Sequence, residues 1–251
     1  MMLKMAKVAQ LCRDYLRITQ SFPVLARNIQ SLKSEVNGPL LRFVTGFQPV
    51  RAFTNKVLRL KKMPIDYPAV TGSEHWRRKS RTIFKCLDSN ADGYLTKEDY
   101  VSSAKRATEY LNLDDEQAER ILNIRLNFWK LLAQDSSDDE SFRVSEAGYV
   151  QSCISVVNQS TFRLEFYPKL LSMEYDAKDF DGDGLLSQKE FAANFYSLRI
   201  PVENAKRAFD SIDSNRDGII SFEEYALGYT EFTFTEEPNN KYNEFFGPLV
   251  D

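Results

Sequence analysis

Histidine is almost absent from this chain, whose 251 residues include one, His75. Acid–base and nucleophilic catalysis most often use an imidazole held beside a second reactive group, so a single His makes such a site hard to assemble. We expect His75 at the start of a helix, without a catalytic role. The chain also lacks a glycine-rich phosphate loop, the Cys/His spacing of a zinc site and a basic groove interleaved with aromatic residues. The sequence therefore predicts a protein that is not an enzyme and does not bind nucleic acid.

Cysteine and long apolar runs are scarce as well. Cys12, Cys86 and Cys153 are scattered and lack metal-ligand spacing, which favours free buried thiols in a reducing compartment over a disulfide framework. The apolar runs are short, so we expect no transmembrane segment. A secretory signal is not expected either, because no apolar core of about 7 to 15 residues follows the first lysines.

Acidic residues are rare in the first quarter of the chain. Residues 1–63 contain twelve Lys and Arg but only Asp14 and Glu35, a net charge of +10, which leaves −13 for residues 64–251 because the whole chain carries −3. From Met5 to Ile18 the segment is amphipathic, Arg-rich and acid-poor, as in a mitochondrial transit peptide. We predict a basic N-terminal extension over 1–63, a linker over 64–72 and a globular domain over 73–251.

Three interpretations of the N-terminal extension stay open. Arg51 stands shortly before Phe53, as at a matrix-processing site, which favours a removable transit peptide. The alternatives are a retained basic helix that binds a membrane or a partner, and an extension without an address. The expected location is accordingly the cytoplasm or the mitochondrial matrix.

The chain is rich in a twelve-residue pattern of oxygen-bearing side chains, which occurs at 88–99, 179–190 and 213–224. Each copy has acid or amide side chains at positions 1, 3 and 5, glycine at 6, a hydroxyl at 9 and a carboxylate at 12. This is the spacing of the EF-hand calcium loop. One such match is also typical of a surface turn rich in Asp, Asn and Gly, but three complete copies favour ion binding.

Ca²⁺ takes about six to eight oxygen ligands at about 2.3 to 2.6 Å, which a short loop can supply. The predicted ligands are Asp88, Asn90, Asp92, Tyr94, Thr96 and Asp99 in the first loop, Asp179, Asp181, Asp183, Leu185, Ser187 and Glu190 in the next, and Asp213, Asn215, Asp217, Ile219, Ser221 and Glu224 in the last. The residue at loop position 7 contributes its backbone carbonyl, and the residue at position 9 coordinates directly or through water. We thus expect three Ca²⁺ sites.

The loops should differ in strength. Asp99 is one methylene shorter than Glu190 and Glu224, so the first site should be weaker for Ca²⁺ or more tolerant of six-coordinate Mg²⁺. The loop at 179–190 carries four carboxylates and the other two carry three each. Repulsion in the ion-free state is therefore largest at 179–190, which makes it the candidate for the tightest site.

EF-hands normally come in pairs, so three should imply a fourth between Asp99 and Asp179. Placing Val144 at the eighth position starts this loop near Ser137, with Phe142 where glycine is needed and Gly148 where the closing carboxylate should stand. This hand should not bind Ca²⁺. The predicted fold is all-α, with four EF-hands in two pairs forming one compact domain. Short antiparallel strands should join the paired loops at the eighth positions, Leu95, Leu186 and Ile220.

Several features together resemble the sarcoplasmic calcium-binding proteins of invertebrates, which the calexcitins and coelenterazine-binding proteins also resemble. They are Trp76-Arg-Arg-Lys79 before the first loop, the degenerate second hand and the tail Phe245-Phe-Gly-Pro-Leu-Val250. The likeness covers roughly residues 73 to 251. It implies a soluble Ca²⁺ buffer that also accepts Mg²⁺, with two halves packed face to face. The long basic N-terminus departs from this pattern.

The leading functional hypothesis is Ca²⁺ buffering by a monomer. A calmodulin-like sensor with a protein target is the rival, but target-binding grooves favour methionine, and only Met173 of the five methionines lies beyond residue 63. A third hypothesis is storage of a coelenterazine-like ligand. The aromatic residues Trp129, Phe128, Phe162, Phe166, Tyr167 and Phe195 are expected in the core rather than in a ligand site.

Overall fold

Helices make up nearly all the regular structure of this chain in the computed structural model, which describes residue 60 and residues 62–251. These described residues form one compact unit. The expectations for Met5–Ile18, Cys12 and a cut after Phe53 lie outside the described residues. The division into 1–63, 64–72 and 73–251 stays a prediction. In the described part of the chain, no helix is long and apolar enough to cross a membrane.

The first pair of hands occupies residues 74–156. It consists of α4 (Glu74–Leu87), β1 (Tyr94–Leu95), α5 (Lys97–Leu111), α6 (Asp115–Ala133), η2 (Gln134–Ser136), β2 (Val144–Ser145) and α7 (Glu146–Val156). In both hands a loop with a two-residue strand connects two helices. The helix–loop–helix order is the one expected from the sequence.

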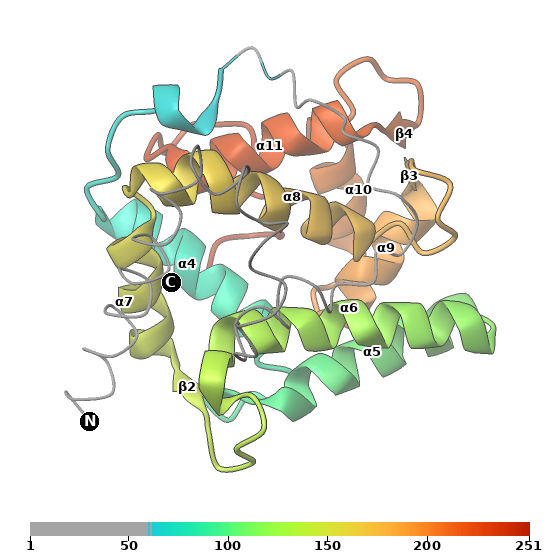
Figure 1. The fold of residues 1–251 in the computed structure, drawn as a ribbon. Coiled ribbons are helices and arrows are strands. Elements are labelled where there is room, and N and C mark those ends of the chain that lie inside the picture. Colours follow the sequence, from blue (N-terminus) through green and yellow to red (C-terminus); the bar gives the residue numbers. More distant parts are fainter. Residues whose placement is uncertain (1–59, 61) are drawn as a thin grey trace, which may run out of the picture. The chain divides into compact units, whose positions relative to one another are not determined.

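The second pair follows over residues 162–234. It consists of the π-helix η3 (Phe162–Phe166), α8 (Tyr167–Asp176), β3 (Leu186–Ser187), α9 (Gln188–Ser197), α10 (Glu203–Ile212), β4 (Ile219–Ile220) and α11 (Phe222–Phe234). A short 3-10 helix, η1 (Pro64–Asp66), precedes the first pair. Figure 1 shows that α8 and α11 cover one side of the domain and α5 and α6 the opposite side, while α9 and α10 close one end.

The loop sequences themselves start the second helix of each hand. In the third hand, the Ser187 hydroxyl accepts from the Glu190 amide at 3.2 Å, and the Glu190 carboxylate accepts from the Ser187 amide at 2.9 Å. Such a capping box satisfies amide groups that a helix N-terminus leaves open. Ser221 and Glu224 repeat the arrangement before α11. One pair of residues therefore serves both helix capping and the predicted ion shell.

The two pairs of loops are joined by short antiparallel strands. Leu95 pairs with Val144, and Leu186 pairs with Ile220. Each pairing joins the residues at the eighth loop positions, as the alignment of the degenerate loop on Val144 requires. The prediction of an all-α domain with four hands in two pairs is confirmed.

Aromatic side chains fill the domain between the helices. Trp129, Tyr167 and Phe195 are at most 1% exposed, so their placement in the core is confirmed, and Phe128 and Phe162 are half-buried. The expectation for Phe166 is wrong, because this side chain is 36% exposed. Consecutive helical side chains point in different directions. Tyr167 takes the core position, and Phe166 stacks on Phe162 with ring centroids 5.7 Å apart.

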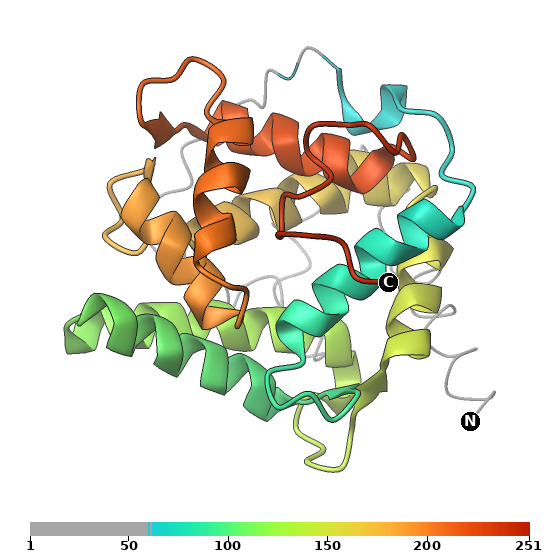
Figure 2. The same cartoon turned by 180° about the vertical axis from the view of Figure 1, so that it is seen from behind.

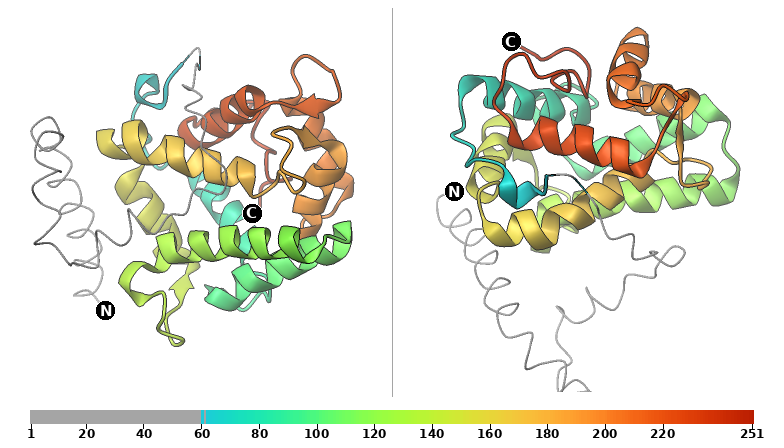
Figure 3. Two further views of the ribbon diagram at one scale, coloured as in Figure 1. Left: turned by 45° about the vertical axis from the view of Figure 1, so that its right-hand side comes forward. Right: turned by 90° about the horizontal axis from the view of Figure 1, so that it is seen from above.

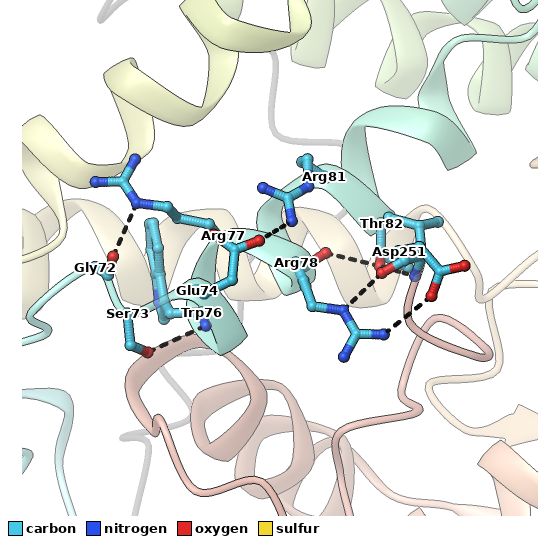
Figure 4. Close-up of polar contacts among 10 residues, drawn as sticks. Gly72, Ser73, Glu74, Trp76, Arg77, Arg78, Arg81, Thr82 and Asp251 are labelled. Atoms are coloured by element: carbon cyan, nitrogen blue, oxygen red, sulfur yellow. Dashed lines mark hydrogen bonds and ion pairs between the residues drawn. The ribbon is translucent and has the colours of Figure 1, made fainter.

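The C-terminal tail after α11 runs back across the domain to α4 (Figure 2). Two side chains of this tail, Phe245 and Phe246, are buried. At its end, Arg78 Nε donates to the Val250 carbonyl at 2.8 Å, and the Val250 amide donates to the Thr82 hydroxyl at 3.1 Å (Figure 4). The tail therefore fastens the last hand to the first helix.

Residues 64–72 lie against the domain, and one arginine bonds three of their carbonyls. Arg163 in η3 is 4% exposed, and its guanidinium donates to the carbonyls of Pro64, Tyr67 and Pro68 at 2.6 to 3.1 Å. Buried side chains accompany these bonds, since Tyr67 is 3% and Val70 is 4% exposed. The predicted linker is thus bonded to the junction between α7 and α8.

Candidate metal centres

Glycine occupies the sharpest turn of each of the three loops. Gly93, Gly184 and Gly218 have φ of +83°, +87° and +88°, a left-handed conformation that costs other L-residues about 1 to 2 kcal/mol. A Cβ at these positions would meet nothing within 4 Å. The turn therefore requires glycine for its backbone conformation and not for lack of space.

The carboxylate at position 1 is held by amides of its own loop. The Gly93 amide donates to Asp88 Oδ2 at 2.9 Å. The equivalent bonds run from Gly184 to Asp179 at 3.1 Å and from Gly218 to Asp213 at 3.0 Å. An ionised carboxylate has about four lone-pair sites, so these bonds fix its orientation and leave sites for a cation.

The side chains at positions 3 and 5 are oriented in the same way. Asn90, Asp181 and Asn215 each accept from the amide two residues later at 3.0 to 3.1 Å. Asp92, Asp183 and Asp217 accept from the amides of Tyr94, Leu185 and Ile219 at 2.8 to 3.0 Å. All three loops thus present the predicted oxygens in one repeated backbone geometry.

The loop at 179–190 gathers three carboxylates in the arrangement that an ion needs. One carboxylate oxygen each from Asp179, Asp181 and Asp183 lies within 4.8 Å of the other two. Oxygens bound to one Ca²⁺ at about 2.4 Å are at most about 5 Å apart. These residues therefore fit a hard divalent cation. They would hold it by electrostatic attraction, and the bound cation would not take part in a reaction.

The position-12 carboxylates close the loops. In each loop the amide at position 2 donates to one carboxylate oxygen. The Ser89 amide donates to Asp99 at 3.0 Å, that of Phe180 to Glu190 at 2.8 Å and that of Ser214 to Glu224 at 2.9 Å. The other oxygen accepts from the residue at position 9, namely Thr96, Ser187 or Ser221. Asp99 makes these two contacts although it is shorter, whereas Glu190 and Glu224 also accept from the amide at position 3, at 3.3 and 3.2 Å. The weaker first site stays a prediction.

Electrostatics distinguish the loops. Burial raises the pKa of Asp179 to about 6, and the Glu190 charge adds to the shift, although amide bonds from Gly182 and Gly184 oppose it. At Glu224, burial also favours the neutral form, but hydrogen bonds from Ser221, Ser214 and Asn215 outweigh it and lower the pKa. Burial therefore disfavours the ionised form of Asp179, and a bound cation would favour it again.

The second hand lacks this geometry. The connection between its two helices is longer: it spans residues 134–145 between α6 and α7, whereas the first hand has residues 88–96 between α4 and α5. Phe142, at position 6, does not have the positive φ of the glycines in the other loops. Gly148 stands at position 12 and offers only a backbone amide, which donates to the Ser145 hydroxyl at 3.3 Å. The loop keeps the strand and the helix start but lacks the closing carboxylate.

Sequence reasoning missed a polar cluster inside the domain, to which α5, α6, α7, α8, α9 and α11 contribute. Tyr225 stacks on Tyr229 at 5.9 Å, and Tyr229 stacks on Tyr167 at 6.0 Å. Arg125 is 3% exposed and donates from Nη2 to the Asn194 side-chain oxygen at 3.1 Å. Arg125 Nε and the Tyr225 hydroxyl are buried without a hydrogen-bond partner.

One signal of this cluster was visible in the sequence. Tyr100 and Tyr225 directly follow the position-12 residues Asp99 and Glu224, and both are buried inside the domain. Glu174 on α8 lies close enough to raise the pKa of Tyr100 and of Tyr225. Tyr100 in turn lies close enough to raise the pKa of Tyr149 on α7. The interior is therefore one residue away from the ends of two loops.

The chain matches known families over two of its hands. The description "EF-hand domain pair" matches residues 78–107, and "EF hand" matches residues 205–227. The luciferin-binding protein of Renilla reniformis is 29% identical over 192 residues, which cover 73% of this chain and all of that protein.

Solved structures of similar shape agree with this relationship. The coelenterazine-binding protein of Renilla muelleri, in its calcium-loaded apo form, is 26% identical with a TM-score of 0.59, over 70% of this chain and 99% of the other. Okadaic acid binding protein 2.1 is 22% identical with a TM-score of 0.53, over 71% and 98% of the chains. At that identity the second likeness concerns the fold alone.

Proposed function

We propose that this chain, a calcium-binding protein with EF-hands, binds Ca²⁺ in three loops and holds one organic ligand inside its four-hand domain. Ca²⁺ and the ligand influence each other's affinity. The observation that carries the proposal is the buried cluster around Arg125 and Tyr225, which contains polar atoms without partners. Buried polar groups are almost always hydrogen-bonded, so orphaned ones indicate a missing partner.

The relatives support an internal ligand. The luciferin-binding protein aligns over its whole length, and the coelenterazine-binding protein has the same fold at 26% identity. The names of both proteins describe binding of a small organic molecule. We extend this class of function to the present chain, and its own ligand is to be identified by binding measurements.

Connectivity supports the coupling between ions and ligand. Glu224 would coordinate the ion in the last loop, and the next residue, Tyr225, belongs to the internal cluster. Asp99 and Tyr100 repeat this relation in the first loop. A carboxylate that shifts toward an ion changes the start of its helix, and the neighbouring tyrosine moves with it. Figure 3 shows α11 and α5 on opposite sides of the interior.

Equilibrium binding to the full chain tests the proposal. Coelenterazine and the neutral probe N-phenylnaphthylamine are titrated in Ca²⁺ and in chelator, with fluorescence as the readout. We expect one site for at least one of them and an affinity that Ca²⁺ changes by about fivefold or more, the usual lower range of allosteric coupling. Absence of saturable binding for both molecules contradicts the internal site. Equal affinities in Ca²⁺ and chelator contradict the coupling.

Ca²⁺ buffering is the second candidate function. The clustered carboxylates of Asp179, Asp181 and Asp183 favour it, because a cation neutralises their repulsion without any partner. Three bound ions, competition by millimolar Mg²⁺ and no ligand binding would select this role. A sensor with a protein target is less favoured, since Met173 is the one methionine beyond residue 63.

Neither role requires the protein to catalyse a reaction, and both suit a monomer. We propose the cytoplasm or the mitochondrial matrix as the location, on the basis of the basic composition of residues 1–63. A fluorescent protein fused to residues 1–63 tests the address. Mitochondrial signal supports a transit peptide, and diffuse signal removes it.

A further inference from the structure

Arg125 is a buried cation that the domain satisfies only in part. The residue lies on α6 and is 3% exposed. Its Nη2 donates to Asn194 Oδ1 at 3.1 Å, which is a neutral acceptor, and its Nε is buried without a partner. Burial lowers the pKa of Arg125, and the charge of Glu174 opposes this shift. An arginine remains charged in proteins, so the interior contains an incompletely compensated positive charge.

The acidic group that influences the ionisation of Arg125 already has a partner. Glu174 on α8 forms an ion pair with Lys178, whose Nζ lies 2.8 Å from Glu174 Oε2 and 2.9 Å from the Glu174 carbonyl. Lys178 is itself 1% exposed. Among residues 62–251, no carboxylate forms an ion pair with Arg125 within 4.0 Å. Glu174 thus forms its ion pair with Lys178, and Arg125 has no carboxylate in direct contact.

The second orphaned group is also a donor. The Tyr225 hydroxyl is buried without a partner, and burial raises its pKa well above the usual range, with the Glu174 charge adding to the effect. The phenol is therefore protonated and offers its O–H. Arg125 and Tyr225 lie near enough to affect each other's ionisation. A hydrogen-bond acceptor would satisfy both groups, and the positive charge of Arg125 favours a negatively charged one.

The surrounding side chains suit an aromatic molecule. Tyr167, Tyr229 and Tyr225 form a stack with interplanar angles of 10° and 16°. Aromatic side chains provide large apolar faces that bind other rings in offset or edge-to-face contact. The anion should therefore be attached to an aromatic scaffold.

We propose that the internal ligand carries one anionic group, such as a carboxylate, a sulfonate or an acidic enol, which accepts hydrogen bonds from Arg125 Nε and the Tyr225 hydroxyl. This inference rests on the proposed function and specifies the chemistry of its ligand. An isolated buried charge is strongly unfavourable unless paired. The anion removes that penalty. A ligand that carries it should therefore bind more tightly than a neutral molecule of the same shape.

Two fluorescent probes of matched shape test the charge requirement. Anilinonaphthalene sulfonate and N-phenylnaphthylamine share an aromatic scaffold and differ in the sulfonate. Each is titrated into the full chain, in chelator and in Ca²⁺, and mutual competition establishes that both occupy one site. We expect the sulfonate to bind at least about tenfold more tightly, as one hydrogen bond to a charged group provides.

The variant Arg125→Met keeps the length of the side chain and removes its charge. It should weaken the sulfonate by at least about tenfold and leave the neutral probe within about twofold. Arg125→Lys should restore part of the sulfonate affinity. Arg143→Met is the matched control, because Arg143 is exposed in the degenerate loop, and it should change neither affinity.

Tyr225→Phe is the second test, since it removes only the orphaned hydroxyl. It should weaken the sulfonate by about threefold or more and spare the neutral probe. Circular dichroism and Ca²⁺ stoichiometry verify the fold of each variant. Equal loss for both probes, or no loss for either, overturns the anion site while the internal ligand stands. Failure of both probes to bind the unsubstituted chain overturns the proposed function together with this inference.

Discussion

The hydroxyl of Tyr175, near the end of α8, donates to the backbone carbonyl of Gly184 in the loop at 179–190, at 3.0 Å. The same oxygen lies 3.0 Å from the carbonyl of Ile220 in β4. The Tyr175 ring meets the Tyr225 ring edge-on, with centroids 5.2 to 5.4 Å from those of Phe222 and Tyr225. One side chain therefore contacts both loops of the second pair and the internal cluster.

Tyr175→Phe should weaken this connection. Loss of the hydroxyl leaves two carbonyls with one partner fewer, so we expect the free energy of unfolding to fall by about 1 kcal/mol. Ca²⁺ binding to the last two loops should also become less cooperative. Urea unfolding and calorimetry measure the two effects. Tyr110→Phe, at an exposed position, is the control, and equal effects of both variants would argue against the connection.

Gly184→Ala should weaken Ca²⁺ binding by the loop at 179–190. An alanine there must adopt φ of +87° to keep the loop shape, at about 1 to 2 kcal/mol, which corresponds to roughly five- to thirtyfold in affinity. An ion-free loop can relax away from this conformation, whereas an ion-bound loop cannot. Calorimetry of the variant gives the affinity. Gly148→Ala in the degenerate loop should leave all three sites unchanged, and the prediction fails if it has the same effect.

Asp99→Glu should strengthen the first site for Ca²⁺ relative to Mg²⁺. Asp99 already contacts Ser89 and Thr96 as the position-12 glutamates contact their equivalents, so the longer side chain has an established geometry to adopt. A bidentate glutamate favours the larger ion, and we expect a gain of about tenfold in the ratio of affinities. Competition titrations measure it. Glu98→Asp, at an exposed neighbouring residue, should not change the ratio.

Lys79 should make stability depend on alkaline pH. It lies on α4 and is 2% exposed, and its Nζ donates to the Thr235 carbonyl at 3.0 Å. Burial lowers its pKa from 10.5 to about 8. Between these values the unfolded chain binds a proton that the folded chain does not, so the free energy of unfolding rises with pH.

The rise should amount to about 1 to 3 kcal/mol between pH 8 and 10.5. Comparison with Lys79→Met isolates it, because the methionine variant lacks this proton. Urea unfolding at several pH values provides the free energies, with Lys105→Met as the exposed control. A constant difference between Lys79→Met and the unsubstituted chain across this range would show that Lys79 does not titrate there.

The parts of the fold that follow from sequence are those encoded locally. A loop such as 213–224 contains its turn glycine, its helix cap and its acidic residues within twelve positions, and Ile220 and Val144 could be assigned as strand residues by alignment alone. The position of the degenerate hand followed in the same way, because each hand is one repeating unit.

What sequence did not reveal depends on contacts between distant residues. Arg163 holds Pro64 and Pro68 across nearly one hundred positions, and no local pattern marks an arginine that donates to remote carbonyls. Phe166 lies outside because Tyr167 occupies the core position beside it. Arg125 has the appearance of an ordinary charged helix residue, and its burial follows only from the packing of α5, α8, α9 and α11 against α6.

The central claim is that three Ca²⁺ loops and one internal ligand site are thermodynamically linked. Calorimetric Ca²⁺ titration of the full chain, with and without saturating anilinonaphthalene sulfonate, tests it most directly. Binding linkage is reciprocal, so the probe must change Ca²⁺ affinity by the same factor by which Ca²⁺ changes probe affinity. We predict three bound ions and a shift of about fivefold or more. A Ca²⁺ isotherm that the bound probe leaves unchanged would contradict the account.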